Sequence, residues 1–465
     1  MLSEIFKAYD VRGTYPGKIN EKLAIRIGCA AGRFYRNQVT GRDSSDPMLQ
    51  HVVVGRDMRK SSPDMAEALI EGLRMAEINV IDLGMVDTSF IYFAINHLGC
   101  AGGIMVTASH NPPNYNGFKF PGLKAAPIGR DTGLGEIQKL AAQVDLDRNP
   151  PEPTGRVEQR DLWPDYKQHV RQFLKLDRPL RIVVDASNGM AGKFMPILFD
   201  DVDGLEIIPL NYQTTGEFAH EPNPLVAENM QTVQAAVKEH GADLGVCFDG
   251  DADRCMFTDE HAELVQADLL GALMAERFLG ESPGSPIVYD LRSSKAMPEH
   301  IEACGGKPVR SRVGHVFMKA LMKEHDAVFG CELSAHVYYR RNYYADSGAI
   351  TFAVALSLLS GQARPMSKLL EPMQRYEQSG ETNFSVEDKQ QAMDQLKDRF
   401  GRGAAVDELD GVTIDKFDRE GWWFNVRPSN TEPLLRLNME ARDEATLARM
   451  FEQVQHMLGQ PVAGH

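Results

Sequence analysis

The chain has 465 residues, with 50 Lys plus Arg against 65 Asp plus Glu, and a formal net charge of -15. This length exceeds what one hydrophobic core supports, so several domains are expected. The 43% hydrophobic and 25% charged residues are typical of a soluble globular protein, and they exclude wholesale disorder, collagen-like repeats and a coiled coil. The negative charge disfavours nucleic-acid binding, because most of the surface would repel a phosphate backbone.

The N-terminus carries Glu4 where a signal peptide has its apolar stretch, and the longest largely apolar run, residues 350–359, is too short to span a membrane. We therefore predict that the protein is neither exported nor membrane-inserted. The cysteines are far apart and form no CxxC pair; they are Cys29, Cys100, Cys247, Cys255, Cys304 and Cys331. We interpret them as reduced core thiols of a cytoplasmic protein, since no nucleophile motif accompanies any of them.

Three apolar, β-branched segments end in polar loops and are predicted to be buried strands: residues 51–57, 181–187 and 286–292. Each is followed by a stretch of helical period, such as residues 64–75, and then by a second apolar run. The second runs are residues 103–106, 244–248 and 327–329. The most distinctive polar segments follow these runs: residues 107–112, 249–254 and 332–336.

This threefold pattern predicts an α/β protein, because ligands of open α/β sheets bind beyond the carboxyl ends of the strands. We expect three similar mixed α/β sheet domains around a central cleft, and a smaller C-terminal α+β domain with strands at 422–426 and 434–439 and a helix over 443–458. The Pro-rich segment 149–155 is a predicted linker, and segment 361–365 marks the end of the third domain. The predicted domains are 1–150, 151–258, 259–365 and 366–465.

Asp249, Asp251 and Asp253 place three mutually repelling carboxylates in one short loop. A hard divalent cation relieves this repulsion. A calcium loop of the helix-loop-helix type is one alternative, with Glu260 at its twelfth position, but Arg254 stands where that loop requires Gly and the flanks resemble strands. A solvated acidic turn is the other alternative. The pattern favours magnesium.

Segment 107–119 is predicted to be a long loop with a diproline and an Asn-Gly turn. Ser109 beside His110 could suggest an acyl-transfer nucleophile, yet neighbouring side chains are expected to point apart and no GxSxG motif is present. A serine on a proline-fixed backbone could instead carry a phosphoryl group whose charge magnesium neutralises. Lys119 is a candidate acid or base, and as a base it would need a lowered pKa. Alone, the loop is better explained as a structural turn; with the three aspartates it indicates an active site.

Other segments carry polar groups suited to a sugar phosphate. Residues 427–433 combine a guanidinium, hydroxyls and an amide, which is phosphate-binding chemistry, although a turn with Arg427 in a surface ion pair is the alternative. Residues 332–336 alternate acceptors and donors as vicinal sugar hydroxyls require, although an edge strand would do the same. The Arg-bearing segments 9–13 and 55–59 are individually consistent with ordinary turns.

Taken together and in this order, the loops at 107–119, 249–254, 332–336 and 427–431 resemble the α-D-phosphohexomutase family, and more narrowly bacterial phosphomannomutase/phosphoglucomutase. The resemblance covers essentially the whole chain, including residues 9–12 and 313–315. It implies four domains around a deep cleft, in agreement with the layout predicted from the strand pattern.

The resemblance also implies roles for single residues. Ser109 matches the serine that is phosphorylated in the active enzyme, and it completes the shell of a Mg²⁺ ion bound by Asp249, Asp251 and Asp253. Lys119 and His315 match proton-transfer residues, and Arg12 and Arg254 match residues that steady the phosphates. The implied substrate-binding residues are Tyr9, Arg292, Gly314, Glu332, Ser334, His336, Arg427, Ser429, Asn430 and Thr431. Arg292 stands where some close members carry a substrate-contacting lysine.

The activity implied is that of a phosphohexomutase. It would interconvert hexose 1-phosphate and hexose 6-phosphate, of mannose, glucose or both, through a phosphoserine and a hexose 1,6-bisphosphate that also acts as activator. The expected partner is the hexose phosphate, with no nucleic acid or membrane, for a monomer or dimer. The bisphosphate must turn end for end, so we predict a hinge near residues 361–365.

Two alternatives on the same scaffold stay open. Leu333 and Ala335 match neither Glu-Met-Ser-Gly-His, common in mannose/glucose enzymes, nor Glu-Gln-Ser-Gly-His of glucosamine enzymes, so a phosphoglucosamine mutase is the first. A magnesium-dependent sugar-phosphate phosphatase is the second. A non-catalytic sugar-phosphate sensor is disfavoured, because Ser109, Lys119 and Asp249 are all retained.

Overall fold

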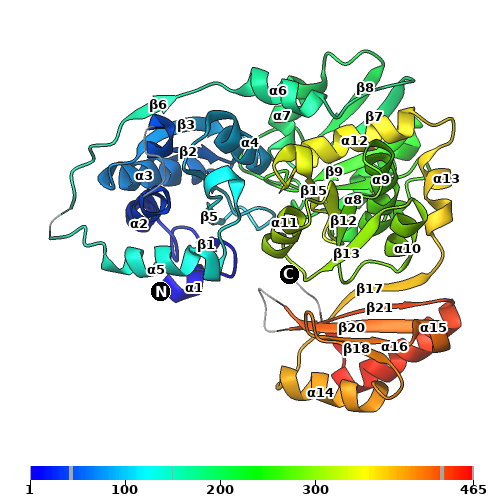
Figure 1. The fold of residues 1–465 in the computed structure, drawn as a ribbon. Coiled ribbons are helices and arrows are strands. Elements are labelled where there is room, and N and C mark those ends of the chain that lie inside the picture. The colour runs from blue at the N-terminus through cyan, green and yellow to red at the C-terminus, as the bar shows by residue number, and fades with distance from the viewer. Residues whose placement is uncertain (1, 41–45, 149, 430–433, 463–465) are drawn as a thin grey trace. The chain divides into compact units, whose positions relative to one another are not determined.

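The structure is a computed structural model that describes residues 2–40, 46–148, 150–429 and 434–462. By its internal contacts the chain forms two compact units. The first unit consists of Met1–Gln266 and Ser334–Ser367, and the second of Ala267–Leu333 and Lys368–His465. Figure 1 shows the helices and strands in sequence order from blue to red.

The first sheet of unit 1 is mixed, with the strand order β1 (Val11–Thr14), β5 (Tyr115–Lys119), β4 (Gly102–Val106), β2 (His51–Arg56), β3 (Asn79–Met85) and β6 (Val157–Gln159). Its helices are α1 (Leu2–Ile5), α2 (Glu21–Val39), α3 (Ser62–Met75), α4 (Thr88–Leu98) and α5 (Leu134–Gln143), with short 3₁₀ turns at Pro47–Gln50, Leu123–Ala125 and Arg130–Thr132. Helices α2 and α3 pack against each other beside this sheet (Figure 1).

Burial on both faces explains the continuous valine run of β2. Val52 and Val54 lie in one core with Leu69 of α3. The alternate residue, Val53, faces the other way, where its side chain and Ile91 of α4 both lie within 3 Å of the point that a Cβ on Gly103 would occupy. Both faces of the strand are therefore covered by helices, as expected of parallel strands in α/β proteins.

The second sheet of unit 1 has the order β11 (Leu264–Val265), β10 (Cys255–Thr258), β9 (Leu244–Phe248), β7 (Leu180–Asp185) and β8 (Leu205–Leu210). Its helices are α6 (Trp163–Arg171), α7 (Ala191–Phe199) and α8 (Ala227–His240). Unit 1 also contains the antiparallel pair β15 (Val337–Tyr339) and β16 (Ala345–Asp346), a 3₁₀ turn at Arg340–Asn342, and α12 (Gly348–Ser360).

Unit 2 begins with α9 (Ala267–Glu281) and a parallel set of β12 (Pro286–Asp290), β13 (Lys307–Ser311) and β14 (Phe329–Cys331), with α10 (Ala296–Ala303) and α11 (His315–Glu324). Helix α13 (Met366–Leu370), whose last residues belong to unit 2, and a 3₁₀ turn at Glu371–Met373 precede the C-terminal sheet. That sheet is antiparallel, in the order β18 (Ala405–Asp407), β19 (Val412–Asp415), β20 (Trp422–Pro428), β21 (Leu435–Ala441), β17 (Glu377–Phe384) and β22 (Pro461–Val462). Helices α14 (Lys389–Phe400), α15 (Phe417–Glu420) and α16 (Glu444–Leu458) accompany it.

The predicted threefold pattern is confirmed at the level of the strands. The strands β2, β7 and β12 each lie between two parallel neighbours, which are the next two strands along the chain. The second neighbour is in each case the strand that leads into a distinctive polar segment: β4 into Thr107, β9 into Asp249 and β14 into Glu332. Mixed α/β sheets and a C-terminal antiparallel sheet confirm the predicted fold class, whereas the boundaries at 150, 258 and 365 stay predictions.

Two details differ from the sequence-based expectation. The second half of segment 107–119 is the strand β5, because residues 115–119 pair with both β1 and β4. The third polar segment follows a strand at Phe329–Cys331 rather than 327–329, because the small residues Gly330 and Cys331 continue the ladder with β12. Among the described residues, no helix combines the length and apolar character needed to cross a membrane.

Candidate active site

Asp249, Asp251 and Asp253, here named the carboxylate group, lie in the turn that joins β9 to the antiparallel β10. All three side chains are buried, with at most 2% of their surface exposed. The flanking strands exclude the helix-loop-helix calcium site that the spacing also allowed. Gly250 allows this turn to approach the Ser109 loop, because a Cβ there would lie only 2.5 Å from the carbonyl oxygen of Ser109.

Two basic side chains face the carboxylate group. Lys119, at the end of β5, places its Nζ 2.6 Å from Oδ2 of both Asp251 and Asp253. Arg254 donates from Nε and Nη2 to Oδ2 of Asp249, at 3.0 and 2.9 Å. Lys119 and Arg254 thus offset part of the negative charge of the three buried carboxylates.

The pKa values reflect these contacts. Burial raises the pKa of Asp249 to about 7, against the opposing effect of Arg254. Burial acts in the same direction on Asp253, but Lys119 and His336 outweigh it and hold the pKa of that carboxyl well below its ordinary value. Burial would lower the pKa of Lys119, yet Asp251 and Asp253 raise it above the usual lysine range. The lowered pKa required of a lysine base is thus not what this arrangement produces.

Ser109 stands at the turn after β4 with its backbone in the left-handed region, at φ 52°. Its Oγ lies 3.3 Å from Oδ2 of Asp249 and 3.1 Å from Nδ1 of His110. The expectation that Ser109 and His110 point apart is therefore wrong, because the left-handed backbone at Ser109 turns both side chains to one side. Arg254 Nη2 also lies 2.5 Å from His110 Nδ1, and burial followed by this charge lowers the pKa of His110 well below its ordinary value.

Arg59 holds the backbone of the Ser109 loop, a role that the sequence did not reveal. The side chain is buried and is fixed by Asp57, whose Oδ2 accepts from Nε at 3.1 Å. Its two Nη atoms donate to the carbonyl oxygens of Ser109, Asn111, Pro112 and Tyr115 at 2.6 to 3.2 Å. The sequence offered one clue to this role, namely the position of segment 55–59 at the end of β2. The parallel neighbour β4 ends at the same edge of the sheet, and the Ser109 loop begins there.

Two other predicted residues of unit 1, Arg12 and His336, contact these loops. Arg12 donates from Nη1 to Oδ1 of Asn111 at 2.6 Å, so it contacts the loop two residues beyond Ser109. His336 Nε2 lies 3.5 Å from Oδ1 of Asp253, and its Nδ1 lies 3.2 Å from the hydroxyl of Ser334. Tyr9 is half-buried near the start of the chain. Thr88, which was not predicted, donates from Oγ1 to Asp251 Oδ2 at 2.5 Å.

In unit 2, Arg292, Arg427 and Arg436, here named the arginine group, converge on Glu381. Arg427 lies on the face of β20 opposite Trp422, Phe424 and Val426, which belong to the hydrophobic core. Nitrogen atoms of the three arginines lie 3.1, 3.3 and 2.8 Å from the Glu381 carboxylate. Arg292 also pairs with Asp290 at 2.8 Å, and although burial opposes it, Asp290 and then Glu381 raise the pKa of Arg292.

The structure describes all but two of the remaining predicted residues of unit 2. The backbone N–H of Gly314 donates to Oε1 of Glu332 at 2.8 Å, and His315 is the first residue of α11. Ser429 is half-buried and directly follows β20. Asn430 and Thr431 lie outside the described residues.

The carboxylate group fits a divalent cation. Its three residues each offer an oxygen within 4.8 Å of the others, and hard oxygen donors are what Mg²⁺ prefers. Oδ1 of Asp251 is buried and accepts no hydrogen bond within the described part of the chain. A buried carboxylate oxygen without a donor is costly unless a cation or a proton reaches it.

Comparison with known proteins relates the chain to a family of sugar-phosphate enzymes. Four family models match, described as phosphoglucomutase/phosphomannomutase alpha/beta/alpha domains I, II and III and the C-terminal domain, over residues 3–148, 164–262, 266–376 and 381–457. Proteins of Xanthomonas campestris pv. campestris named phosphohexose mutases are 40% identical over 452 residues, which cover 96% of this chain and 97% of theirs. A phosphomannomutase of Escherichia coli K12 is 38% identical, covering 95% of this chain and 96% of its own. A crystal structure of a phosphoglucomutase/phosphomannomutase family protein from Burkholderia thailandensis superposes with a TM-score of 0.87 at 34% identity, covering 98% of this chain and 97% of that one.

Proposed function

The chain belongs to the phosphoglucomutase/phosphomannomutase family of phosphohexomutases, and on this premise we propose that it moves a phosphoryl group between the 1- and 6-hydroxyls of a hexose by way of Ser109. It is an enzyme that transfers phosphate within a sugar molecule. The proposed role of Ser109 rests on the position of its Oγ, which lies 3.3 Å from a carboxylate oxygen of Asp249. Among the described residues, the loop that contains Asp249 is the only one in which three buried aspartates meet.

Each transfer exchanges one bond to phosphorus for another. The bond between phosphorus and Ser109 Oγ breaks while a bond from phosphorus to the free sugar hydroxyl forms, and the hydroxyl proton passes to a base. The hexose 1,6-bisphosphate then turns and returns its other phosphoryl group to Ser109. The protein contributes positioning and positive charge, which phosphoryl transfer requires more than covalent chemistry.

We assign the positive charge to Arg254, Arg12 and Lys119. Arg254 donates to Asp249, and its Nη2 contacts His110 Nδ1, the same atom that the Ser109 hydroxyl contacts. A Mg²⁺ ion held by Asp249, Asp251 and Asp253 would cancel charge on the phosphoryl oxygens. Because its two carboxylate partners keep Lys119 protonated, we assign it first to donating a proton to the leaving oxygen, and His315 to accepting the proton of the attacking hydroxyl.

The sugar and its second phosphate would be bound by residues that carry complementary groups. We assign the sugar hydroxyls to Glu332, Ser334 and His336. The distal phosphate would go to Arg427, Ser429, Asn430 and Thr431, with Tyr9, Arg292 and Gly314 as further contacts. The four-domain division at 150, 258 and 365, the hinge at 361–365 and a cytoplasmic location belong to the same proposal; all six cysteines are free thiols, which suits a reducing compartment.

The test combines chemistry with turnover. Intact-mass measurement after incubation with glucose 1,6-bisphosphate should show one added phosphoryl group, absent in Ser109→Ala. That variant should also lose at least about 10³-fold in conversion of mannose 1-phosphate and glucose 1-phosphate to their 6-phosphates. Ser360→Ala, which is equally buried at 4% exposure, should keep both properties.

Full turnover in Ser109→Ala would refute the proposed role of the serine. Release of inorganic phosphate at the rate of isomerisation would instead support the phosphatase. Preference for glucosamine 1-phosphate over both hexose phosphates would support the phosphoglucosamine mutase.

A further inference from the structure

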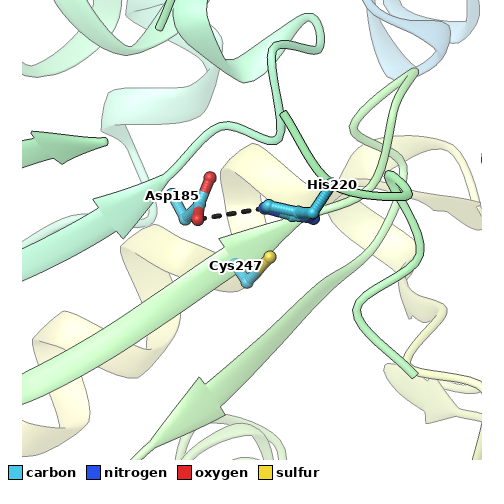
Figure 2. A group of neighbouring side chains, drawn as sticks. All are labelled: Asp185, His220 and Cys247. Atoms are coloured by element: carbon cyan, nitrogen blue, oxygen red, sulfur yellow. Dashed lines mark hydrogen bonds and ion pairs between the residues drawn. The ribbon is translucent and has the colours of Figure 1, made fainter. Parts of the chain in front are cut away.

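Outside the candidate active site, a further group of side chains that can bind a metal ion lies at the carboxyl ends of β7 and β9. Asp185 ends β7, and Cys247 is its Cα partner on the adjacent parallel strand β9, so the two side chains leave the same face of the sheet. His220 comes from the segment between β8 and α8 and places its Nε2 3.2 Å from Oδ2 of Asp185. One oxygen, one nitrogen and the sulfur all lie within 4.8 Å of one another (Figure 2).

The orientation of the His220 ring is informative. Its Nδ1 lies 2.8 Å from the carbonyl oxygen of Glu221, and only a protonated Nδ1 can make that hydrogen bond. In a neutral ring the lone pair of Nε2 would then face the carboxylate of Asp185, which is repulsive. A cation or a second proton must lie between them. A histidine whose other ring N–H donates to a backbone carbonyl is the usual arrangement of a metal ligand.

The carboxylate is held in the same manner. Asp185 accepts from the backbone N–H of Ser187 at 2.8 Å and from the amide of Asn211 at 3.0 and 3.1 Å. These donors fix the carboxylate while leaving Oδ2 facing His220. Outer hydrogen bonds of this kind orient the oxygen ligands of protein metal sites.

The thiol completes the set. Cys247 is fully buried and its Sγ lies 3.3 Å from the Ser187 hydroxyl, while the Asp185 side chain is also fully buried and that of His220 is 16% exposed. Two ligands of one zinc ion lie about 3 to 4 Å apart, given Zn–N and Zn–S bonds of about 2.0 and 2.3 Å. Because the sulfur lies within 4.8 Å of the facing oxygen and nitrogen (Figure 2), a small movement brings all three donors to one ion.

We propose that Asp185, His220 and Cys247 bind a zinc-class divalent ion at a site separate from the carboxylate group. A site made of a thiolate, an imidazole and a carboxylate prefers zinc to magnesium, whereas a site made of three carboxylates prefers magnesium. Binding releases the thiol proton and the proton between His220 and Asp185, and the ion ties the segment that carries His220 to the ends of β7 and β9. Cys247 lies two residues before Asp249, so the ion would also brace the start of the carboxylate group.

The experiment uses the full chain, stripped of metal and then titrated with Co²⁺ in the presence of excess Mg²⁺, which occupies the carboxylate group. Thiolate bound to cobalt gives a charge-transfer absorption band, and we expect one equivalent of it. Cys247→Ala should abolish the band, and His220→Gln should weaken the affinity at least about tenfold. Zinc should raise the melting temperature of the unchanged chain but not of Cys247→Ala.

The matched control is Cys304→Ala. Among the described residues, Cys304 belongs to the other candidate metal-binding group that contains a thiol, together with Glu276 and His300, and it is less buried than Cys247. It should leave the band and the zinc-dependent stabilisation intact. A band lost in Cys304→Ala and kept in Cys247→Ala would overturn the proposal. So would the absence of any thiolate band in the folded unchanged chain, which would reduce the group to an ion pair of His220 and Asp185.

Discussion

The carboxylate group and the arginine group are two buried charge clusters of opposite sign, each within one compact unit. In the first, three aspartates face Lys119 and Arg254; in the second, three arginines face Glu381 and Asp290. Carboxylates thus predominate in the first cluster and guanidiniums in the second. Because an uncompensated buried charge is costly, the first invites a metal cation and the second a phosphate anion.

The local folding of the two clusters also differs. The carboxylates sit in one turn of six residues, so their proximity is written into consecutive sequence. Arg292 lies just after β12, while Arg427 and Arg436 lie on β20 and β21, where they are cross-strand partners. Like charges directly opposite on a sheet are destabilising, and Glu381 on the neighbouring β17 relieves them. The first cluster is a sequence motif, and the second exists only after the sheet has formed.

The largest expected effect follows from removing one charge of the carboxylate group. Asp251→Asn should lower mutase turnover at least about 10³-fold, because a ligand of the proposed metal is lost where charge develops in the transition state. Steady-state assays at saturating Mg²⁺ measure this. Asp259→Asn is the control, because one oxygen of Asp259 accepts both of its backbone hydrogen bonds and an amide preserves them. Turnover close to that of the unchanged chain in Asp251→Asn would contradict the metal role.

The pH dependence of the free energy of unfolding tests whether the buried carboxyl of Asp87 is protonated in the folded protein. Burial raises the pKa of Asp87 to about 7, although Tyr166 and backbone N–H groups lower it. Between about pH 4 and 7 the folded chain therefore holds a proton that the unfolded chain has lost, so the free energy of unfolding falls as pH rises. The fall from this residue is about 4 kcal/mol. Urea titrations across this range should show it, and Asp87→Asn should make the pH dependence shallower while the contribution of Asp249 remains; an unchanged slope in that variant would assign the effect elsewhere.

In the arginine group, Glu381→Gln removes the anion on which three guanidiniums converge. We expect a loss of about 3 kcal/mol in the free energy of unfolding, because the arginines become uncompensated. Added inorganic phosphate should restore part of this loss, since an anion bound to the folded state stabilises it. Glu377→Gln, on the exposed part of the same strand, should change stability by less than about 0.5 kcal/mol. A loss without phosphate rescue would show that the cluster is structural only.

The smallest expected effect concerns Lys119. Lys119→Met should lower turnover about 10²-fold if the lysine donates a proton. The same change should tighten Mg²⁺ binding, because the competing cation beside Asp251 and Asp253 is gone. Isothermal titration measures the binding separately from turnover. Weaker Mg²⁺ binding would show that Lys119 supports the metal site instead of competing with it.

Sequence reasoning predicted the local features well, for a physical reason. Strands that are buried on both faces must be apolar, and the polar segment that follows them must lie at the sheet edge. The threefold pattern and the loop of three aspartates could therefore be predicted from consecutive residues. Errors arose where backbone conformation or long-range pairing intervened. The left-handed backbone at Ser109 brought His110 to the same side, and pairing with β1 and β4 converted residues 115–119 from a loop into a strand.

What the sequence by itself determined is the residue chemistry at each strand end: a serine, three carboxylates, the alternating polar residues of segment 332–336 and an arginine segment. Only the tertiary structure decided which atoms meet. Lys119 reaches aspartates more than 130 positions away, Arg59 holds the carbonyls of the Ser109 loop, and Cys247 lies beside Asp185 and His220. Turn and strand preferences act between near neighbours, whereas these contacts depend on sheet register and burial, which no short segment encodes.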